Sequence, residues 1–322
     1  MPLQLTPSGL REMLPRAPQD ILDAFFAKQH LLAAAGITQT RTRFAYFLAN
    51  LEHESGGFTI KNLTENIFYS PERMAVVFKS RVSSAALVRS RFGTSPGWQY
   101  KAFDALYGNR MGNRPGTRDG STFIGHGGPQ WTGRDGHEAL ARILKTLIPG
   151  LGDITAEQAI EYAIDHSRQP EVCVAFWIWK GLNKYADVGN FTGCVKVWNG
   201  GTNGLADREA LLAGNDPVIK KLAMVNQLMP TIKTLPGGPD TPAPPKDVTD
   251  EATKTARNAR TVVIAGGTAA GVNETAKQTQ VPHAPILSTP VAVVAVGVAV
   301  AIVVILSAEI ARKKAAVIRN WF

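Results

Sequence analysis

The sequence predicts a mainly α-helical domain over residues 1–233, followed by a linker, one membrane-spanning helix and a short basic tail. Three observations lead to this prediction. Apolar residues recur every three or four positions in several segments before residue 233, and few stretches alternate with a period of two. Proline and glycine are concentrated in residues 234–247. Residues 291–308 carry no charged side chain.

Several segments of the first domain show the helical spacing. They are residues 20–36, 40–54, 70–82, 157–167, 170–182 and 216–229. Capping residues support these assignments, because Ser70 precedes Pro71 at one helix start and glycine stands where apolar runs should end. Those glycines are Gly36, Gly56 and Gly181. The glycine-rich stretch 108–136 is expected to hold loops and a short hairpin.

The C-terminal part of the chain has the composition of a linker and a membrane anchor. We expect a linker rich in Pro, Gly, Ala and Thr over residues 234–288, a transmembrane helix over 289–308 and a basic tail over 309–322. The apolar run is at the short end of the roughly 17 to 25 residues that a membrane-spanning helix needs. A hydrophobic helix buried in protein or in an oligomer is the alternative.

Charges beside the apolar run set the expected topology. Arg312, Lys313, Lys314 and Arg319 follow it, which predicts a cytoplasmic C-terminus and a first domain on the periplasmic, cell-wall side. The N-terminus lacks the basic start, apolar run and small-residue cleavage site of a secretory signal. We therefore expect delivery by a route other than ordinary secretion, such as from a virus particle.

The formal net charge of +9 favours an anionic partner, either nucleic acid, an acidic cell-wall polymer or anionic lipid. Nucleic acid is disfavoured, because no zinc-finger spacing, basic-region heptad or RNA-binding aromatic signature is present. No metal or cofactor is expected. His53 and Glu54 begin a zinc-protease pattern, but Gly57 stands where its second histidine is required. Cys173 and Cys194 are expected to be small buried side chains, with a single bridge left open.

Glu54 stands at the end of an apolar helix. The apolar stripe along that helix consists of Phe44, Phe47, Leu48 and Leu51. Its spacing continues to Glu54 and not to Glu52, and two glycines then let the chain turn away. Partly apolar surroundings would raise the pKa of the Glu54 carboxyl group, as a general acid requires. A carboxylate in a structural hydrogen-bond network at a helix end is the equal alternative.

Glu65 supplies a second carboxylate, in the connection before the helix that Ser70 caps. Glycoside hydrolysis uses a pair of carboxyl groups. A loop carboxylate opposite a helix-end carboxylate suits the activation of water by the loop group. Glu65 therefore favours the catalytic interpretation of Glu54.

Ordered blocks of the sequence resemble those of glycoside hydrolase family 19, the chitinase-like hydrolases, and above all its bacteriophage and bacterial cell-wall lysins. The blocks are "FLANLEHESGGF" (47–58), "TENIFYSPERM" (64–74), "YGNRMGN" (107–113), "GHGGPQWTGRDGH" (125–137) and "WNGGTNGLADR" (198–208). The resemblance covers roughly residues 5–230. It implies a mostly helical, lysozyme-like fold and hydrolysis with inversion, with Glu54 as general acid and Glu65 as general base.

The resemblance also implies a set of residues around the substrate. Gln130 would line the sugar cleft, and Thr132 would position the attacking water through its hydroxyl group. Asn199 would form a hydrogen bond to substrate. Arg208 would hold the cleft together by pairing with a carboxylate, a planar contact that arginine makes well. For Asn199 and Arg208 a purely structural role is the alternative.

Two positions depart from the family pattern, since His126 replaces the usual arginine and Gly136 replaces an asparagine. We count His126 with the substrate-binding residues. Trp131 and, less strongly, Tyr69, Tyr107 and Trp198 are candidates for stacking on sugar rings, although aromatic residues at helical spacing more often belong to the core. Trp179 is expected to be such a core residue.

Together these features predict a peptidoglycan glycosidase that hydrolyses β-1,4 bonds between amino sugars. The expected partners are peptidoglycan and, through the C-terminal helix, a membrane, with virion or lysis proteins as further candidates. A chitinase is the alternative within the same class. A membrane-anchored virion protein or cell-wall-binding structural protein is the alternative from another class. A lysin that acts at infection and a lysis-stage enzyme are equally compatible with the sequence.

Overall fold

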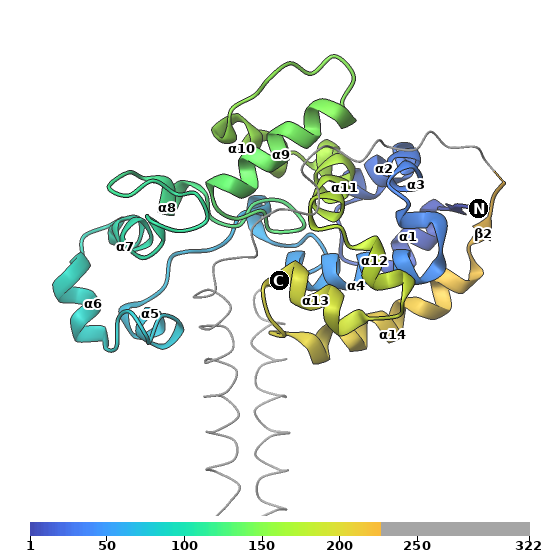
Figure 1. Ribbon diagram of the computed structural model, residues 1–322. Helices are drawn as coiled ribbons and strands as arrows, with labels where there is room; N and C mark the ends of the chain where they lie inside the picture. Colours follow the sequence, from blue (N-terminus) through green and yellow to red (C-terminus); the bar gives the residue numbers. More distant parts are fainter. Residues whose placement is uncertain (227–322) are drawn as a thin grey trace, which may run out of the picture. The chain divides into compact units, whose positions relative to one another are not determined.

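The computed structural model describes residues 1–226, which fold mainly into α-helices as the sequence predicts (Figure 1). The α-helices are α1 (Pro7–Met13), α2 (Gln19–Ala27), α3 (Gln29–Ala34), α4 (Arg41–Ser55), α5 (Pro71–Val77), α6 (Ala85–Phe92), α7 (Trp98–Tyr107), α8 (Asp119–Thr122), α9 (Arg134–Leu147), α10 (Ala156–Ile164), α11 (Gln169–Lys180), α12 (Asn183–Asp187), α13 (Phe191–Asn199) and α14 (Leu205–Lys221). Short 3₁₀ helices are η1 (Ile37–Gln39), η2 (Lys61–Leu63) and η3 (His166–Arg168). Two short strands, β1 (Leu3–Gln4) and β2 (Ala223–Met224), pair antiparallel.

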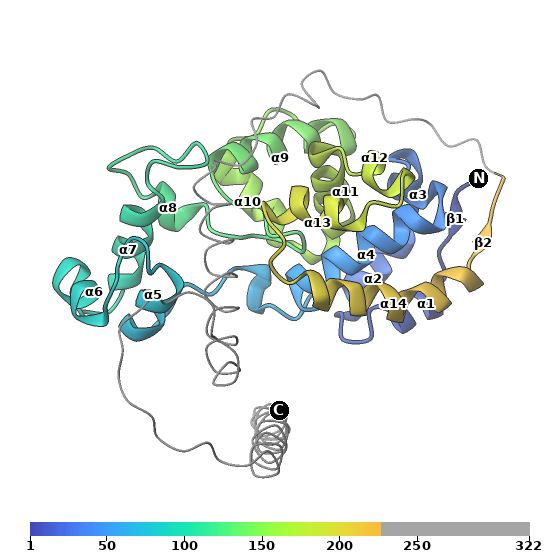
Figure 2. The ribbon, with the colours of Figure 1, turned by 60° about the horizontal axis from the view of Figure 1, so that its bottom comes forward.

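Helix α4 lies in the larger of two apolar clusters. All its residues from 44 to 52 are buried, so the helix is enclosed on every side and not along one stripe alone. Figure 2 shows α14 running alongside α4, with α13 and α11 close by. The ring of Phe47 packs edge-on against Trp177 of α11 at 5.6 Å, and Tyr46 packs against Phe191 of α13 at 4.8 Å. The middle of α4 is therefore held from several directions.

A second apolar cluster forms around α5, α6 and α7. Phe78 and Phe103 pack edge to face at 5.7 Å within it. Residues 64–70 connect η2, beside the first cluster, to the start of α5. This connection carries Glu65, so the two predicted catalytic carboxylates come from different parts of the fold.

The predicted helix boundaries are confirmed where capping residues set them. The Ser70 hydroxyl accepts the Arg73 N–H at 3.1 Å, with Pro71 at the first helical position. Gly56 and Gly181 end α4 and α11 in the left-handed conformation, with φ of 60° and 59°. The expected hairpin is also present, because His126 and Trp131 exchange two backbone hydrogen bonds of 2.9 Å.

Two predicted segments differ from the structure. Residues 20–36 form two helices, because Lys28 leaves helical geometry between α2 and α3. Of the segment predicted over 216–229, residues 216–221 are the end of α14, which begins at Leu205 and includes Pro217, and residues 227–229 lie outside the described residues. The first turns of α14 are polar, so apolar spacing did not reveal where the helix begins. The helix ends at Lys221, because the next residues form β2 and pair with β1 from the other end of the described region.

Several predictions fall beyond residue 226. These are the end of the first domain, the linker over 234–288, the transmembrane helix over 289–308 and the tail over 309–322, all of which lie outside the described residues. Within residues 1–226, no helix is both long and apolar enough to span a bilayer. Cys173 and Cys194 are both fully buried free thiols, so the bridge left open by the sequence is not formed.

Candidate active site

Glu54 projects from the last turn of α4 toward the first turn of α14. Its carboxylate Oε1 forms an ion pair with Nη2 of Arg208. The Arg208 side chain is 1% exposed, and its Nη1 also donates to Oδ1 of Asn50 at 2.9 Å. An anion stabilises a buried guanidinium, so Glu54 takes part in the structural network at the helix end that the sequence left open as the alternative. The other oxygen, Oε2, receives no hydrogen bond from residues 1–226.

The contrast that the apolar stripe predicts between Glu54 and Glu52 of α4 is not found. Glu52 is the more buried residue, at 7% exposed, and its Oε2 accepts a hydrogen bond of 3.2 Å from Asn215. Burial raises the pKa of Glu52, and the hydrogen bond from Asn215 opposes that shift. The apolar stripe did not distinguish the two carboxylates, because α4 is buried all round. What distinguishes Glu54 is that it lines a cleft.

A second contact fixes the end of α4 next to the first. Nδ1 of His53 lies 2.5 Å from Oδ2 of Asp207, one residue before Arg208. Gly204 packs against the His53 ring so closely that a Cβ there would lie 2.4 Å from Nε2. Neither His53 nor Asp207 was predicted from the sequence to hold this helix end. His53 directly precedes Glu54 and Asp207 directly precedes Arg208, so consecutive residues of the two helices form consecutive contacts. This matching order was the signal in the sequence that could have indicated the contact.

Glu65 is held by the backbone of Gly125. Its N–H donates to the Gly125 carbonyl oxygen at 2.8 Å, and its Oε2 accepts the Gly125 N–H at 3.0 Å. Burial raises the pKa of Glu65, the bond from Gly125 opposes this, and the negative charge of Glu54 adds to it. The two carboxylates are thus electrostatically coupled.

Gln130 and Thr132 belong to the same hairpin region as Gly125. A Cβ on Gly125 would lie 2.4 Å from Oε1 of Gln130 and 3.4 Å from Cβ of Glu65, so the glycine permits the close packing of these two residues. Nε2 of Gln130 donates to the Gly127 carbonyl oxygen at 2.9 Å. The Thr132 hydroxyl donates to the Gln130 carbonyl oxygen at 3.0 Å, which leaves its lone pairs able to accept.

A cleft of about 1820 Å³ brings most of these residues together. The predicted residues that line it are Glu54, Glu65, Gln130, Thr132 and Asn199. Nδ2 of Asn199 donates to the Asn203 carbonyl oxygen at 3.3 Å, at the end of α13. Side chains from the predicted block 107–113 also line the cleft.

Two predicted substrate contacts are wrong. Trp131 is fully buried, donates its Nε1 hydrogen to the Val172 carbonyl oxygen at 3.2 Å and does not line the cleft. His126 is 5% exposed and bonds through Nδ1 to Nε2 of His137 at 3.1 Å. The hairpin directs both side chains into the protein, while Gln130 and Thr132 line the cleft.

Tyr69 and Arg208 are not among the side chains that line the cleft. The Tyr69 ring packs against Phe78 and Phe103 beside the second apolar cluster and is only partly buried, so its predicted sugar contact stays a prediction. Burial and, secondly, the charge of Glu65 raise the pKa of Tyr69. Arg208 is too buried to contact substrate, but the pairing with a carboxylate expected for it is present, with Glu54 as the partner.

The cleft contains residues that the sequence analysis did not assign to it. Trp179, expected in the core, is only partly buried and lines the cleft, with its ring stacked on Trp131 at 4.9 Å. Lys180, Lys184 and Lys196 line it as well. The four-residue spacing of the first two was visible in the sequence, but the position of the third depends on how α13 packs.

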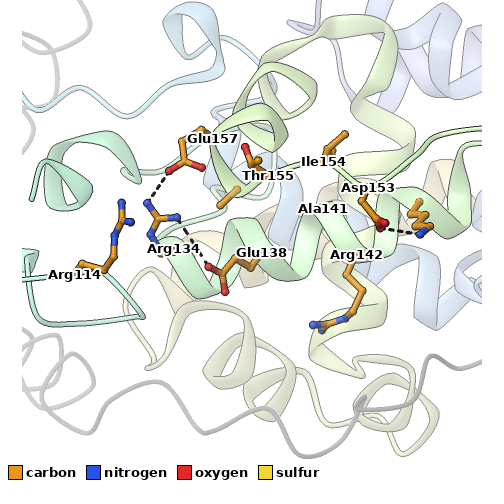
Figure 3. A pocket seen from close by; sticks show the side chains of 11 residues that line it. Arg114, Arg134, Glu138, Ala141, Arg142, Asp153, Ile154, Thr155 and Glu157 are labelled. Carbon is orange, nitrogen blue, oxygen red and sulfur yellow. Dashed lines mark hydrogen bonds and ion pairs between the residues drawn. The ribbon is translucent and has the colours of Figure 1, made fainter.

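A smaller pocket of about 630 Å³ lies between α9 and α10 (Figure 3). Its polar lining is an ion-pair network in which Arg134 contacts Glu157 at 2.7 Å and Asp119 at 2.8 Å. The guanidinium groups of Arg134 and Arg114 hold the pKa of Asp119 well below its usual range. We interpret this network as structural, because it ties the loop before α8 to α9 and α10. Figure 3 shows Arg142 extending away from Asp153 and Glu157.

Residues 1–226 contain no cluster of three or more histidine, cysteine or acidic side chains placed to hold a metal ion. Comparison of the chain with protein-family models and with curated proteins finds no match in either case.

Proposed function

We propose that this protein is an inverting glycoside hydrolase that cleaves β-1,4 bonds between the amino sugars of peptidoglycan. The observation that carries the proposal is a single large cleft with a carboxylate from a helix end and a carboxylate from a loop, each in different surroundings. Glu54 is paired with a buried arginine. Glu65 accepts a backbone N–H, and the negative charge of Glu54 contributes to raising its pKa. Glycosidases use such a pair with divided roles.

In this proposal Glu54 is the general acid. Glu54 acts in its protonated form. Its Oε2, which accepts no hydrogen bond from residues 1–226, carries the proton and donates it to the glycosidic oxygen as the bond from that oxygen to C1 breaks. Glu54 then carries the negative charge. Arg208 is positioned on Oε1 to stabilise that charge as it develops, without having to move.

Glu65 is the general base of the same step. Its carboxylate takes a proton from a water molecule, whose oxygen forms the new bond to C1 on the opposite face of the sugar. The Thr132 hydroxyl, with its hydrogen engaged by Gln130, accepts a hydrogen bond from that water and so orients it. Glu65 later releases its proton and Glu54 regains one, which restores both groups.

The substrate class and the location belong to the same proposal. The similarity of the sequence blocks to those of cell-wall lysins and the net charge of +9 support peptidoglycan, a polyanion, over neutral chitin. Anchoring by residues 289–308 would keep the cleft beside the wall. Extraction of membranes at alkaline pH tests this, because the full chain should stay in the pellet and a chain lacking residues 289–322 should not.

Digestion of purified Gram-negative peptidoglycan by the full-length protein tests the activity. Mass spectrometry of the fragments should find new reducing ends, and the terminal sugar names the bond. Glu54→Gln should abolish them, while Glu209→Gln, an exposed carboxylate one residue beyond Arg208, should not. Reducing ends from colloidal chitin but not from peptidoglycan would identify a chitinase. Binding to the wall with no new ends from either polymer would overturn the glycosidase proposal.

A further inference from the structure

The cleft is lined in part by lysines without acidic partners among residues 1–226. Lys180 ends α11, Lys184 lies in α12 and Lys196 lies in α13, and all three line the cleft. None of them forms an ion pair with a residue of 1–226. The Glu54 carboxylate in the same cleft is already paired with Arg208.

Lys180 is the most enclosed of the three lysines. Its Nζ lies 3.9 Å from the centre of the Trp179 ring and 5.4 Å from that of Phe176. Burial lowers its pKa to about 8, so the side chain is still mostly charged at neutral pH. An aromatic face offsets part of the cost of removing an ammonium group from water, but it does not replace an anion. The position therefore suits a cation that meets its anion in a ligand.

Unpaired hydrogen-bond donors accompany the lysines. The Nε1 atoms of Trp179 and Trp198 are buried and have no acceptor among the described residues. Both residues line the cleft. Buried indole N–H groups normally find an acceptor, so these two donors add unused hydrogen-bonding capacity to the side chains that line the cleft with the lysines.

We propose that Lys180, Lys184 and Lys196 form a subsite for the carboxylates of the peptides attached to peptidoglycan. This inference rests on the proposed function, because it assigns these anions to the same amino-sugar polymer that the carboxylates cleave. Chitin carries no carboxylate, whereas the peptide stems of peptidoglycan carry several. The subsite thus makes the cleft select a peptide-bearing glycan over a neutral one.

The test compares two forms of one substrate with two sets of variants. Purified peptidoglycan is used as isolated and after its carboxylates have been converted to amides. The variants of the full-length protein are K180Q/K184Q/K196Q and a control, K79Q/K101Q/K220Q, which removes the same charge from exposed lysines outside the cleft. Amidation should raise the KM of the wild type and of the control at least tenfold. The first variant should show the raised KM on both substrates.

The preference of each variant for the unmodified substrate decides whether the subsite exists. A cleft variant that retains the wild-type preference for the unmodified substrate overturns it, as does a control variant that loses the preference equally. Because Lys180 is partly buried, K184Q/K196Q changes only exposed residues and should show an intermediate loss of preference in a folded protein. Replacing all three lysines by arginine should restore the preference.

The subsite can be tested separately from the chemistry. If the wild type releases no reducing ends from either substrate, the glycosidase proposal fails, and sedimentation with the two forms of peptidoglycan then measures binding alone. Tighter binding to the unmodified form that is lost in the cleft variant supports the subsite. Equal binding of wild type and cleft variant to both forms overturns it.

Discussion

Glu54 has two functions in this protein. It is the proposed general acid, and among residues 1–226 it is the only acidic side chain that pairs with the buried Arg208. We expect Glu54→Gln to lower turnover at least ~100-fold. It should also lower the free energy of unfolding by about 1–3 kcal/mol, because Arg208 is left without its anion. Reducing-end release and denaturant unfolding measure the two effects.

A double variant separates the two functions of Glu54. Replacing both members of the pair, Glu54→Gln with Arg208→Met, removes the uncompensated charge and should recover part of the lost stability. It should not recover activity, because the acid is still missing. A Glu54→Gln protein as stable as the wild type would show that the pair contributes nothing to folding.

Glu65 is expected to have the opposite effect on stability. Its pKa is raised in the folded protein, so folding favours its protonated form, and the stability from this preference is lost as pH rises from about 4.5 through the raised value. Glu65→Gln should therefore match the wild type at pH 4 and be more stable at pH 7, while losing activity. Unfolding curves across this range measure the difference. A constant difference at all pH values would contradict the prediction.

At the scale of elements, the hairpin of residues 125–132 determines which predicted residues reach the cleft. Alternation along the hairpin directs His126 and Trp131 inward, and Gln130 and Thr132 line the cleft. Motif resemblance placed all four in one block but did not specify their directions. Those directions depend on contacts with Val172 and His137, which follow 41 and 11 residues later in the chain.

Local signals predicted the helices better than they predicted the cleft. Caps such as Ser70 and Gly56 act within a few residues, so the sequence specified them. The lysines of the cleft could not be predicted in this way. Lys180 of α11 and Lys196 of α13 come to line the same cleft only when these helices pack together. The ion pair of Glu54 with Arg208 joins residues 154 positions apart, and only the family resemblance indicated it.

Gly125 tests how tightly the hairpin must pack against Glu65. We expect Gly125→Ala to reduce kcat about tenfold or more, because its Cβ would lie 2.4 Å from Oε1 of Gln130 and would displace this side chain of the hairpin from its position beside Glu65. Gly152→Ala is the matched control, since its Cβ would meet nothing within 4 Å. Steady-state kinetics of both variants measure the effect, and equal kcat values would show that the hairpin yields without cost.

The stability of the whole described region should depend on pH through the buried pair of His126 and His137. Nδ1 of His137 donates to the Gly133 carbonyl oxygen at 2.8 Å, so its Nε2 accepts a hydrogen from Nδ1 of His126. Burial lowers the pKa of His126 to about 3, with His137 contributing, and lowers the pKa of His137 to about 4. Both rings are therefore neutral in the folded protein well below pH 6.5.

Because both folded pKa values are depressed, stability is present above pH 6.5 and is lost as pH falls toward 4. In this window each histidine changes the free energy of unfolding by up to about 1.4 kcal/mol per pH unit. The reason is that the histidine binds a proton in the unfolded chain but not in the folded protein. His126→Asn keeps a donor near Nδ1 and should make the slope of unfolding free energy against pH shallower. His30→Asn, at an exposed position, should leave the wild-type slope. Equal slopes in all three proteins would mean that acid unfolding is governed by other groups.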